Sequence, residues 1–327
     1  MSESGDELND NDEDIDAFAD DIDAFADDSD VFAVDARSAE QNTNEKLLFQ
    51  SMALSVSDAA DFLLWKDASI VAIVGESNGG KTTLITELYG RFLKGSFAEF
   101  NFCHSLSLLG FEKKSFQSRA VSERSLPDTP RTSAQDGLSF FHLAVASGTD
   151  FKRHDLLISE RAGEDYKRVR DTPALASDML ELRNASSIAL IIDGERVADP
   201  RQRHQGFAPV RNIIDTIIGN DKILPLTRVQ LVTTKFDLLN IQGLEKAVVA
   251  LAKFEKTMTE KLASKFEVTV IRTSARGAPN LDMDPASGLD ELLNSWVQPR
   301  PKEPTDKIPM PELTNEFDRL LLKRARA

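Results

Sequence analysis

The sequence has few of the features that mark secreted or membrane proteins. Its 327 residues include a single cysteine, Cys103, so no disulfide can form within the chain, which suits a reducing cytosol. No apolar run approaches the ~18 residues needed to span a bilayer. The acidic N-terminus matches neither a secretory signal nor a basic transit peptide, and no myristoylation or prenylation motif is present. We therefore expect a cytoplasmic protein with no transmembrane segment, in which Cys103 is a small buried apolar residue.

The sequence also lacks an excess of basic charge. The formal net charge is −15, but 15 of the 54 acidic residues lie in residues 1–36, which contain no Lys or Arg. The other 39 acidic residues balance the 39 basic ones. The acidity therefore belongs to a tail, and nothing indicates a nucleic-acid-binding face. The four histidines show no metal-binding spacing, and we expect them, like Trp65 and Trp296, to have structural roles.

Residues 1–44 are expected to be a disordered acidic tail, and they contain a repeat. The heptapeptide IDAFADD occurs twice and the related SDVFAVD follows, which places Phe18, Phe25 and Phe32 seven residues apart. In a helix these three side chains would share one face. The pattern therefore indicates that residues 15–35 dock on a protein partner. The alternative is an acidic tail that only increases solubility.

A second tail is expected at residues 299–327. It begins with five prolines, typical of a stiff extended linker, and ends in an amphipathic helical pattern. That helix would dock back on the domain, or else contact a partner or a membrane surface. Between the tails, residues 45–298 are expected to form one domain, because a composition that is 41% hydrophobic can bury a core.

Apolar runs alternate with helical patterns through this domain. Strands are expected at Ile70–Val74, Leu138–Val145, His154–Glu160, Ser187–Asp193, Val229–Thr233 and Val268–Ile271. Helices are expected in part of Asn44–Trp65, after the first strand, and at Pro200–Ile218, Leu244–Phe266 and Gly288–Trp296, with a mobile loop at Glu112–Asp136. The second and third strands form a hairpin. The pattern predicts a three-layer α/β fold whose mostly parallel sheet has one antiparallel strand.

The functional prediction depends on the segment that follows the first strand. It contains Gly75-x-x-x-x-Gly80-Lys81-Thr82 between a strand and a helix, the pattern of a phosphate-binding P-loop. Its backbone N–H groups would point at phosphate oxygens, Lys81 would reach the β- and γ-phosphates, and the Thr82 hydroxyl would ligate Mg²⁺. The expected phosphate-binding residues are Gly75, Glu76, Ser77, Asn78, Gly79, Gly80, Lys81, Thr82 and Thr83. The alternative, a chance Gly-rich turn, fits poorly with the strand before it and the helix after it.

Two further motifs indicate which nucleotide binds. Thr234-Lys235-Phe236-Asp237 matches the [NT]-K-x-D pattern, in which the Asp237 carboxylate would accept two hydrogen bonds from guanine that adenine cannot donate. Ser274-Ala275-Arg276 matches the S-A-[KR] pattern, whose backbone N–H would contact guanine O6; its alternative is an ordinary strand-to-loop turn. Both motifs follow strands, and ligands of such sheets bind at strand ends. They predict binding of GTP and GDP; an ATP-dependent enzyme is the weaker alternative.

Taken with these motifs, four more segments carry a resemblance to a known family. They are Arg131-Thr132 followed by LSFFHL, then ERAGE, then LIIDGERVADP, then VQLVTTKFDLL. The chain resembles a P-loop GTPase of the TRAFAC class, and more closely the bacterial type 2 double-GTPase family of conflict and signalling systems, over Ala68–Val297. The resemblance implies a Ras-like P-loop NTPase fold, hydrolysis of GTP and a Mg²⁺ cofactor. Only one P-loop is present, so a second GTPase would be a separate chain.

The resemblance also assigns residues on the γ-phosphate side, with two departures from the usual pattern. Glu160-x-x-Gly163 stands where the class has D-x-x-G, so Glu160 would hold Mg²⁺ through water and the Gly163 N–H would contact the γ-phosphate. Glu164 stands where many GTPases have a Gln that orients the attacking water, so slow hydrolysis is expected. The alternatives are a solvated strand-end carboxylate at Glu160 and a dipole-favoured helix N-terminal acid at Glu164.

Two residues of the predicted loop complete the expected catalytic set. Thr132 is the candidate that closes on Mg²⁺ and the γ-phosphate, with Thr129 as its competitor. Arg131 is a candidate arginine finger in cis, or else a surface charge. Lys81, Glu164 and Arg131 are thus the expected catalytic residues, and Thr82, Thr132 and Glu160 the expected metal-side residues. We expect a GTP-hydrolysing regulatory switch; the alternative is a non-hydrolysing scaffold that recruits a partner through its acidic repeats.

Overall fold

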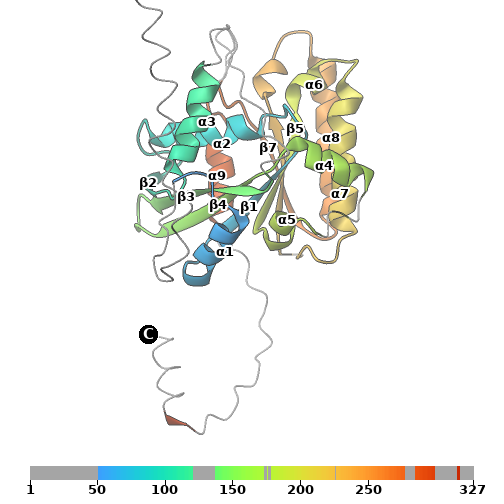
Figure 1. The fold of residues 1–327 in the computed structure, drawn as a ribbon. Coiled ribbons are helices and arrows are strands. Elements are labelled where there is room, and N and C mark those ends of the chain that lie inside the picture. The colour runs from blue at the N-terminus through green and yellow to red at the C-terminus, as the bar shows by residue number, and fades with distance from the viewer. Residues whose placement is uncertain are drawn as a thin grey trace, which may run out of the picture. The chain divides into compact units, whose positions relative to one another are not determined.

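The computed structural model describes residues 51–120, 137–172, 175, 178–224, 226–276, 284–298 and 315–316, and these contain a seven-stranded sheet in the order β2-β3-β4-β1-β5-β6-β7 (Figure 1). The strands are β1 (Ser69–Val74), β2 (Phe100–His104), β3 (Ser139–Ser147), β4 (Arg153–Glu160), β5 (Ser187–Asp193), β6 (Arg228–Thr234) and β7 (Glu267–Arg272). Of these, β3 alone runs against the others, because it pairs antiparallel with both β2 and β4 while the remaining neighbours are parallel. The predicted sheet, mostly parallel with one antiparallel strand, is confirmed.

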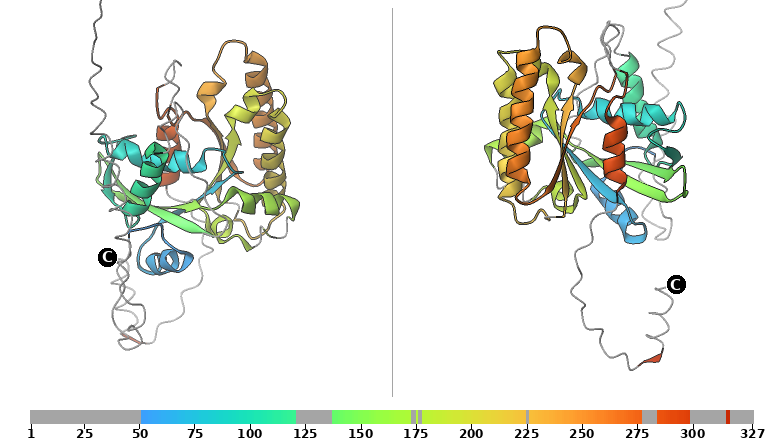
Figure 2. Two further views of the ribbon diagram at one scale, coloured as in Figure 1. Left: turned by 45° about the horizontal axis from the view of Figure 1, so that its top comes forward. Right: turned by 180° about the vertical axis from the view of Figure 1, so that it is seen from behind.

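Helices cover both faces of the sheet. They are α1 (Val56–Trp65), α2 (Lys81–Phe92), α3 (Leu108–Ala120), α4 (Gly163–Asp171), α5 (Leu180–Asn184), α6 (Gly194–Ala198), α7 (Arg203–Ile218), α8 (Glu245–Leu262) and α9 (Leu289–Val297), with a 3₁₀ turn at Phe236–Leu238. One apolar core joins α7 and α8 to β5 and β6, and a second joins α2 and α9 to β1, β3 and β4. Figure 2 shows α8 on one side of the sheet and α9 on the other. The domain is therefore a three-layer α/β structure.

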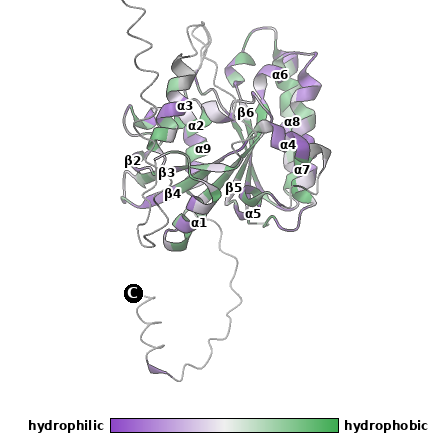
Figure 3. Cartoon of the chain, in the orientation of Figure 1, coloured by the Kyte–Doolittle hydropathy of each residue, from purple (hydrophilic) through white to green (hydrophobic). Residues whose placement is uncertain are grey.

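The sequence explains why helices can cover both faces of β5 and β6. Every residue of β5 and β6 is buried, as expected for parallel strands covered by helices on both faces. Figure 3 shows the hydrophobic residues concentrated on the central strands and hydrophilic residues on α4. At the start of the domain, α1 begins with a capping box, in which the Ser55 side chain accepts from Asp58 N and the Asp58 carboxylate accepts from Ser55 N.

The region between the P-loop helix and the hairpin differs from the prediction. Residues Glu112 to Ala120, expected to start a mobile loop, belong to helix α3. The helix is held by Phe111, which is fully buried and stacks on Tyr89 with ring centroids 4.6 Å apart. Strand β2 was not predicted either, because only its first residue is buried and its pattern is too short to recognise. The rest of the predicted loop, residues 121–136, lies outside the described residues.

Two predictions about single residues are wrong. Cys103 is exposed on β2 rather than buried, and Trp65 is 68% exposed at the end of α1 rather than packed. Trp296 is fully buried in α9, as predicted. Residues 1–50 and, apart from 315–316, the chain after 298 lie outside the described residues, so the acidic repeat and the C-terminal helix stay predictions.

Candidate functional site

The P-loop joins the end of β1 to the start of α2. Gly80 caps α2 with a φ of 87°, a left-handed conformation that favours glycine, and Asn78 adopts a φ of 65°. The Lys81 side chain turns back across the loop, where its Nζ donates to the carbonyl oxygens of Gly75 at 2.7 Å and Glu76 at 2.9 Å. The loop therefore curls around its own lysine at the N-terminus of a helix, the geometry expected for binding phosphates.

Lys81 lies among acidic side chains. Burial lowers its pKa to about 8, and the nearby carboxylates of Glu164, Glu160 and Glu76 oppose that shift. Desolvation disfavours the charged ammonium, whereas each carboxylate favours it. A polyphosphate placed here would add negative charge beside Lys81 and so favour its protonated form.

The segment Glu160–Glu164 packs directly on the P-loop. A Cβ on Gly163 would lie 2.1 Å from the backbone nitrogen of Ser77, so only glycine fits at this position. The next residue, Glu164, lies in the first turn of α4 and accepts a hydrogen bond from the Ser77 hydroxyl at 2.9 Å. Two of the predicted γ-phosphate residues therefore contact one P-loop residue.

Glu160 ends β4 beside the first turn of α2. The Thr82 hydroxyl donates to Glu160 Oε1 at 3.2 Å, and Lys114 of α3 lies 3.3 Å from the same oxygen. A hydroxyl and a carboxylate are the oxygen donors that Mg²⁺ prefers, and the ion usually keeps several waters and needs few protein ligands. The pair Thr82 and Glu160 thus fits a Mg²⁺ site. The described residues contain no cluster of three or more His, Cys, Asp or Glu that would bind a metal without a nucleotide.

The Thr234–Asp237 motif follows β6 and contacts the P-loop. The Thr234 hydroxyl donates to the Gly79 carbonyl at 2.7 Å. Lys235 has a φ of 52°, and its Nζ donates to the Asn78 carbonyl at 2.9 Å and to Glu195 at 2.7 Å. The phosphate loop and the base-recognition motif are therefore linked by hydrogen bonds.

Asp237 and Ser274 are buried residues of the predicted base site whose side chains have no partner within the described residues. Asp237 is 8% exposed, and its carboxylate has no hydrogen bond or ion pair within the described residues. The Ser274 hydroxyl is also buried without a partner in the described part of the chain. The backbone of the second motif is fixed by Ser274 N, which donates to the Ser287 carbonyl at 3.1 Å, and by Ala275 O, which accepts from Ala286 N at 3.1 Å. Arg276 follows as the last described residue before the gap at 277–283.

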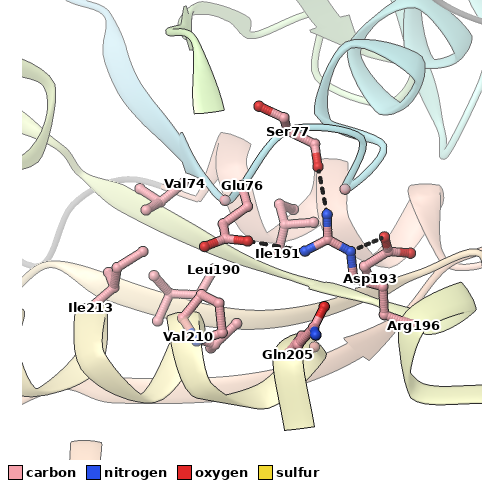
Figure 4. A pocket seen from close by; sticks show the side chains of 14 residues that line it. Val74, Glu76, Ser77, Leu190, Ile191, Asp193, Arg196, Gln205, Val210 and Ile213 are labelled. Carbon is pink, nitrogen blue, oxygen red and sulfur yellow. Dashed lines mark hydrogen bonds and ion pairs between the residues drawn. The ribbon is translucent and has the colours of Figure 1, made fainter. Parts of the chain in front are cut away.

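Arg196 belongs to this site, although the sequence did not identify it. From α6 it donates to Glu76 Oε2 at 2.9 Å and to the Ser77 carbonyl at 3.3 Å, and its Nε lies 3.5 Å from Asp193 Oδ2 (Figure 4). A small cavity of about 20 Å³, room for about one water, adjoins these contacts. Arg196 therefore ties the end of β5 to the P-loop. Two sequence signals could have suggested it, namely its position three residues after the strand-end Asp193 and its place within LIIDGERVADP, a segment that carries the family resemblance.

The structure brings together most of the predicted site residues. The P-loop residues, Glu160, Gly163, Glu164 and the two strand-end motifs meet at the carboxyl ends of β1, β4, β5, β6 and β7. Arg131, Thr132 and Thr129 lie outside the described residues, so their predicted roles are untested. Sequence patterns also did not indicate Lys114, because a lysine in a polar segment carries no signal of what it will contact.

Comparison with known families shows the family of this chain. The family model described as Double-GTPase 2 matches residues 69–297, which is most of the chain. None of the curated proteins matches the chain. Among the described residues, no helix has the length and apolarity to cross a membrane.

Solved structures similar to this chain include GTPase-like domains. The GTP-bound Ski7 GTPase-like domain of S. cerevisiae is 15% identical with a TM-score of 0.40, over 73% of this chain and 52% of that chain. The GDP-bound Roco2 RocCORdC of Methanosarcina barkeri is 14% identical with a TM-score of 0.35, over 71% and 49%. The chain thus spans about half the length of the solved chains it matches.

Proposed function

The chain belongs to the Double-GTPase 2 family, and on that premise we propose that it binds GTP and hydrolyses it to GDP and phosphate. One observation carries the proposal. The P-loop lysine follows β1, and Asp237, whose carboxylate has no partner within the described residues, follows β6. The Thr234–Gly79 hydrogen bond links these two strand ends, which lie on either side of β5. A site that pairs phosphate binding with a guanine-specific acceptor suits guanine nucleotides.

The P-loop would bind the phosphates. Its backbone N–H groups and the N-terminus of α2 supply partial positive charge, and Lys81 supplies a full one. On binding, the ammonium would exchange part of its bonding to the Gly75 and Glu76 carbonyls for phosphate oxygens. The Thr82 hydroxyl and the Glu160 carboxylate would hold Mg²⁺, which would neutralise charge on the β- and γ-phosphates.

Asp237 would select the base. Its carboxylate has no protein partner within the described residues, so guanine N1–H and the exocyclic amino group would be its hydrogen-bond donors. An adenine in the same place would leave the carboxylate unpaired, which is costly in a buried site. The backbone at Ser274, Ala275 and Arg276 would contact guanine O6.

Hydrolysis would require the γ-phosphate side to rearrange. In this structure Gly163 contacts the Ser77 backbone, and Glu164 accepts the Ser77 hydroxyl hydrogen bond. To orient an attacking water, Glu164 would have to exchange that hydrogen bond for one from the water. We further propose that Thr132 closes on the Mg²⁺ side and that Arg131 stabilises charge in the transition state. Because Glu164 is itself an anion, we expect slow turnover.

The change at Gly163 and Glu164 would make the protein a nucleotide-dependent regulatory switch. We propose a cytoplasmic protein that acts in bacterial defence or signalling, in which residues 15–35 bind a protein partner. The described domain then corresponds to the switch, and the proposed boundaries are 1–44 for the acidic tail, 45–298 for the GTPase domain and 299–327 for the C-terminal linker and helix.

The test is single-turnover hydrolysis of GTP by the full chain, with Mg²⁺ and with EDTA, beside a Lys81→Ala variant. We expect hydrolysis that needs both Mg²⁺ and Lys81. Lys113→Ala is the matched control, because it removes one exposed lysine far from the P-loop in the sequence. Hydrolysis at the same rate in the Lys81 variant would refute the proposal.

A second candidate is a scaffold that binds GTP without hydrolysing it. The hydrogen bond from Ser77 to Glu164 favours it, because the residue expected to orient water is already occupied. Tight binding of GTP without turnover in the same experiment would support this function. It would also direct attention to the partner of residues 15–35.

A further inference from the structure

Helix α3 carries a cation into the predicted metal site. Lys114 Nζ lies 3.3 Å from Glu160 Oε1, the oxygen that also accepts the Thr82 hydrogen bond. The Glu160 side chain is 5% exposed and that of Lys114 is 20% exposed, so this ion pair is shielded from solvent. The ammonium therefore sits on the carboxylate that a P-loop GTPase would use on the Mg²⁺ side.

The position of Lys114 is fixed by packing, one turn earlier in the same helix. Phe111 is fully buried against Tyr89 of α2, and the Tyr89 hydroxyl donates to Glu112 at 2.8 Å. A Cβ on Gly110 would lie 2.8 Å from Ala53 N, so the start of α3 lies tightly against the chain before α1. The Phe111 and Glu112 contacts attach α3 to α2, the helix that begins with Lys81, and the Gly110 contact attaches it to the segment before α1. Lys114 is thus presented to Glu160 by a rigid support rather than by a free surface chain.

We propose that Lys114 is a built-in cation of this site, which neutralises Glu160 in the absence of Mg²⁺ and competes with Mg²⁺ for that carboxylate. The inference rests on the proposed function, since it assumes that guanine nucleotides and Mg²⁺ bind here. A buried carboxylate is stable only when a positive charge or hydrogen-bond donors compensate it. Lys114 and the Thr82 hydroxyl both stabilise the negative charge of Glu160. A bound Mg²⁺ would have to replace Lys114 in this role.

Two consequences follow for nucleotide binding. Without Mg²⁺, the Lys114 ammonium stays paired with Glu160 and neutralises a carboxylate that would otherwise repel the phosphates. With Mg²⁺, the ammonium must leave Glu160, which weakens the binding of the ion. The protein would therefore depend less on Mg²⁺ for holding GDP than a site without this lysine.

The test compares Lys114→Met with Lys113→Met in the full chain. Both variants remove one positive charge from the same helix, but Lys113 is exposed. The affinity for a fluorescent GDP analogue is measured in Mg²⁺ and in EDTA, and Mg²⁺ is titrated into the nucleotide complex. For Lys114→Met we expect GDP affinity in EDTA to fall and the half-saturating Mg²⁺ concentration to fall, each by roughly five- to tenfold. Lys113→Met should match the wild type in both.

Several outcomes would overturn the inference while leaving the proposed function intact. One is a Lys114→Met protein that binds GDP like Lys113→Met in both conditions. Another is a variant that loses hydrolysis with unchanged affinities for GDP and Mg²⁺, which would make Lys114 a transition-state contact. A wild-type protein that binds no GDP in Mg²⁺ would instead overturn the proposed function and this inference together. Lys114→Gln provides the same comparison if the Met variant does not fold, and Lys114→Arg should retain the wild-type affinity in EDTA.

Discussion

The two halves of the proposed nucleotide site differ in how many of their polar groups have partners within the protein. On the phosphate side, Lys81, Glu164 and Glu160 each have partners within the protein. On the proposed base side, the Ser274 hydroxyl is buried without a partner, and the Asp237 carboxylate, in a residue that is 8% exposed, also has none in the described part of the chain. The three phosphate-side groups are therefore paired within the protein, whereas these two base-side groups are left to pair with a ligand or with water.

This difference predicts that nucleotide affinity and base specificity depend on different residues. Phosphate binding must exchange existing protein hydrogen bonds for new ones, so the net gain per contact is modest. Base binding satisfies a carboxylate that is otherwise left unpaired, so a wrong base is strongly disfavoured. We therefore expect changes at the base side to alter which nucleotide binds. Changes at the phosphate side should alter how tightly any nucleotide binds and how fast it reacts.

The largest expected effect comes from Asp237→Asn, which changes the hydrogen-bonding pattern of the base side. An amide can donate to the O2 of xanthine where the carboxylate accepted from guanine. We expect GTP affinity to fall by about 100-fold or more and the affinity for xanthosine triphosphate to rise. Competition binding against a fluorescent nucleotide measures both, with the exposed Asp221→Asn as the control. Unchanged GTP affinity would show that Asp237 does not read the base.

Gly163→Ala tests the tight packing of the phosphate side. The added Cβ would lie 2.1 Å from Ser77 N and 2.5 Å from the Glu76 carbonyl carbon, and neither backbone atom can move cheaply. We expect a loss of about 1–3 kcal/mol of stability and a hydrolysis rate lowered by more than about tenfold. Thermal unfolding and single-turnover kinetics measure the two effects. Gly90→Ala in the last turn of α2 is the control, because a Cβ there meets nothing within 4 Å and should be neutral or stabilising.

The pH dependence of nucleotide affinity reports on Lys81. Its pKa of about 8 in the free protein means that the ammonium loses its proton as the pH rises through that value, whereas bound phosphates favour the charged form. Binding must then take up a proton, so GDP affinity should fall by up to about tenfold per pH unit above pH ~8. Fluorescence titrations on both sides of pH 8 measure this slope. A Lys81→Met variant that keeps the same slope would assign it to another group.

The smallest expected effect is that of Arg196→Met. It removes the hydrogen bonds to Glu76 and to the Ser77 carbonyl but leaves the P-loop held by Lys81 and Thr234. A partly exposed ion pair contributes at most about 1 kcal/mol, so we expect GDP affinity to fall by about threefold to fivefold. The exposed Arg201→Met controls for loss of charge. A loss above about 100-fold would mean that Arg196 contacts the nucleotide directly.

The sheet and the main motifs were predictable because their signals are local. Ser187–Asp193 is a buried strand over the residues predicted, since each of its seven residues is buried and apolar residues dominate it. The P-loop is recognised from residues adjacent in the sequence, and its strand ended where the pattern predicted. The burial of Asp237 also agrees with its position three residues after a buried strand.

The parts that were missed depend on contacts distant in the sequence. Residues Glu112 to Ala120 have a polar composition typical of a loop, but Phe111 packs on Tyr89 and holds them as a helix. Trp65 shows the opposite error, because an aromatic residue is usually packed and here it is exposed. Lys114 and Arg196 could not be found either, since their partners Glu160 and Glu76 lie 46 and 120 residues away in the sequence.

The central position of β1 has a consequence for the time at which the site forms. The hydrogen bonds around its strand and loop join residues 86 apart at Ile73 and Ser159, 116 apart at Ile70 and Ser186, and 155 apart at Gly79 and Thr234. A ribosome adds roughly 5–20 residues per second, so the last of these partners follows the P-loop by roughly 8–30 seconds. During that interval the nascent chain contains the complete P-loop sequence but lacks the strands that hydrogen-bond to it in the folded domain. Its apolar strand is then exposed to other nascent chains and to chaperones.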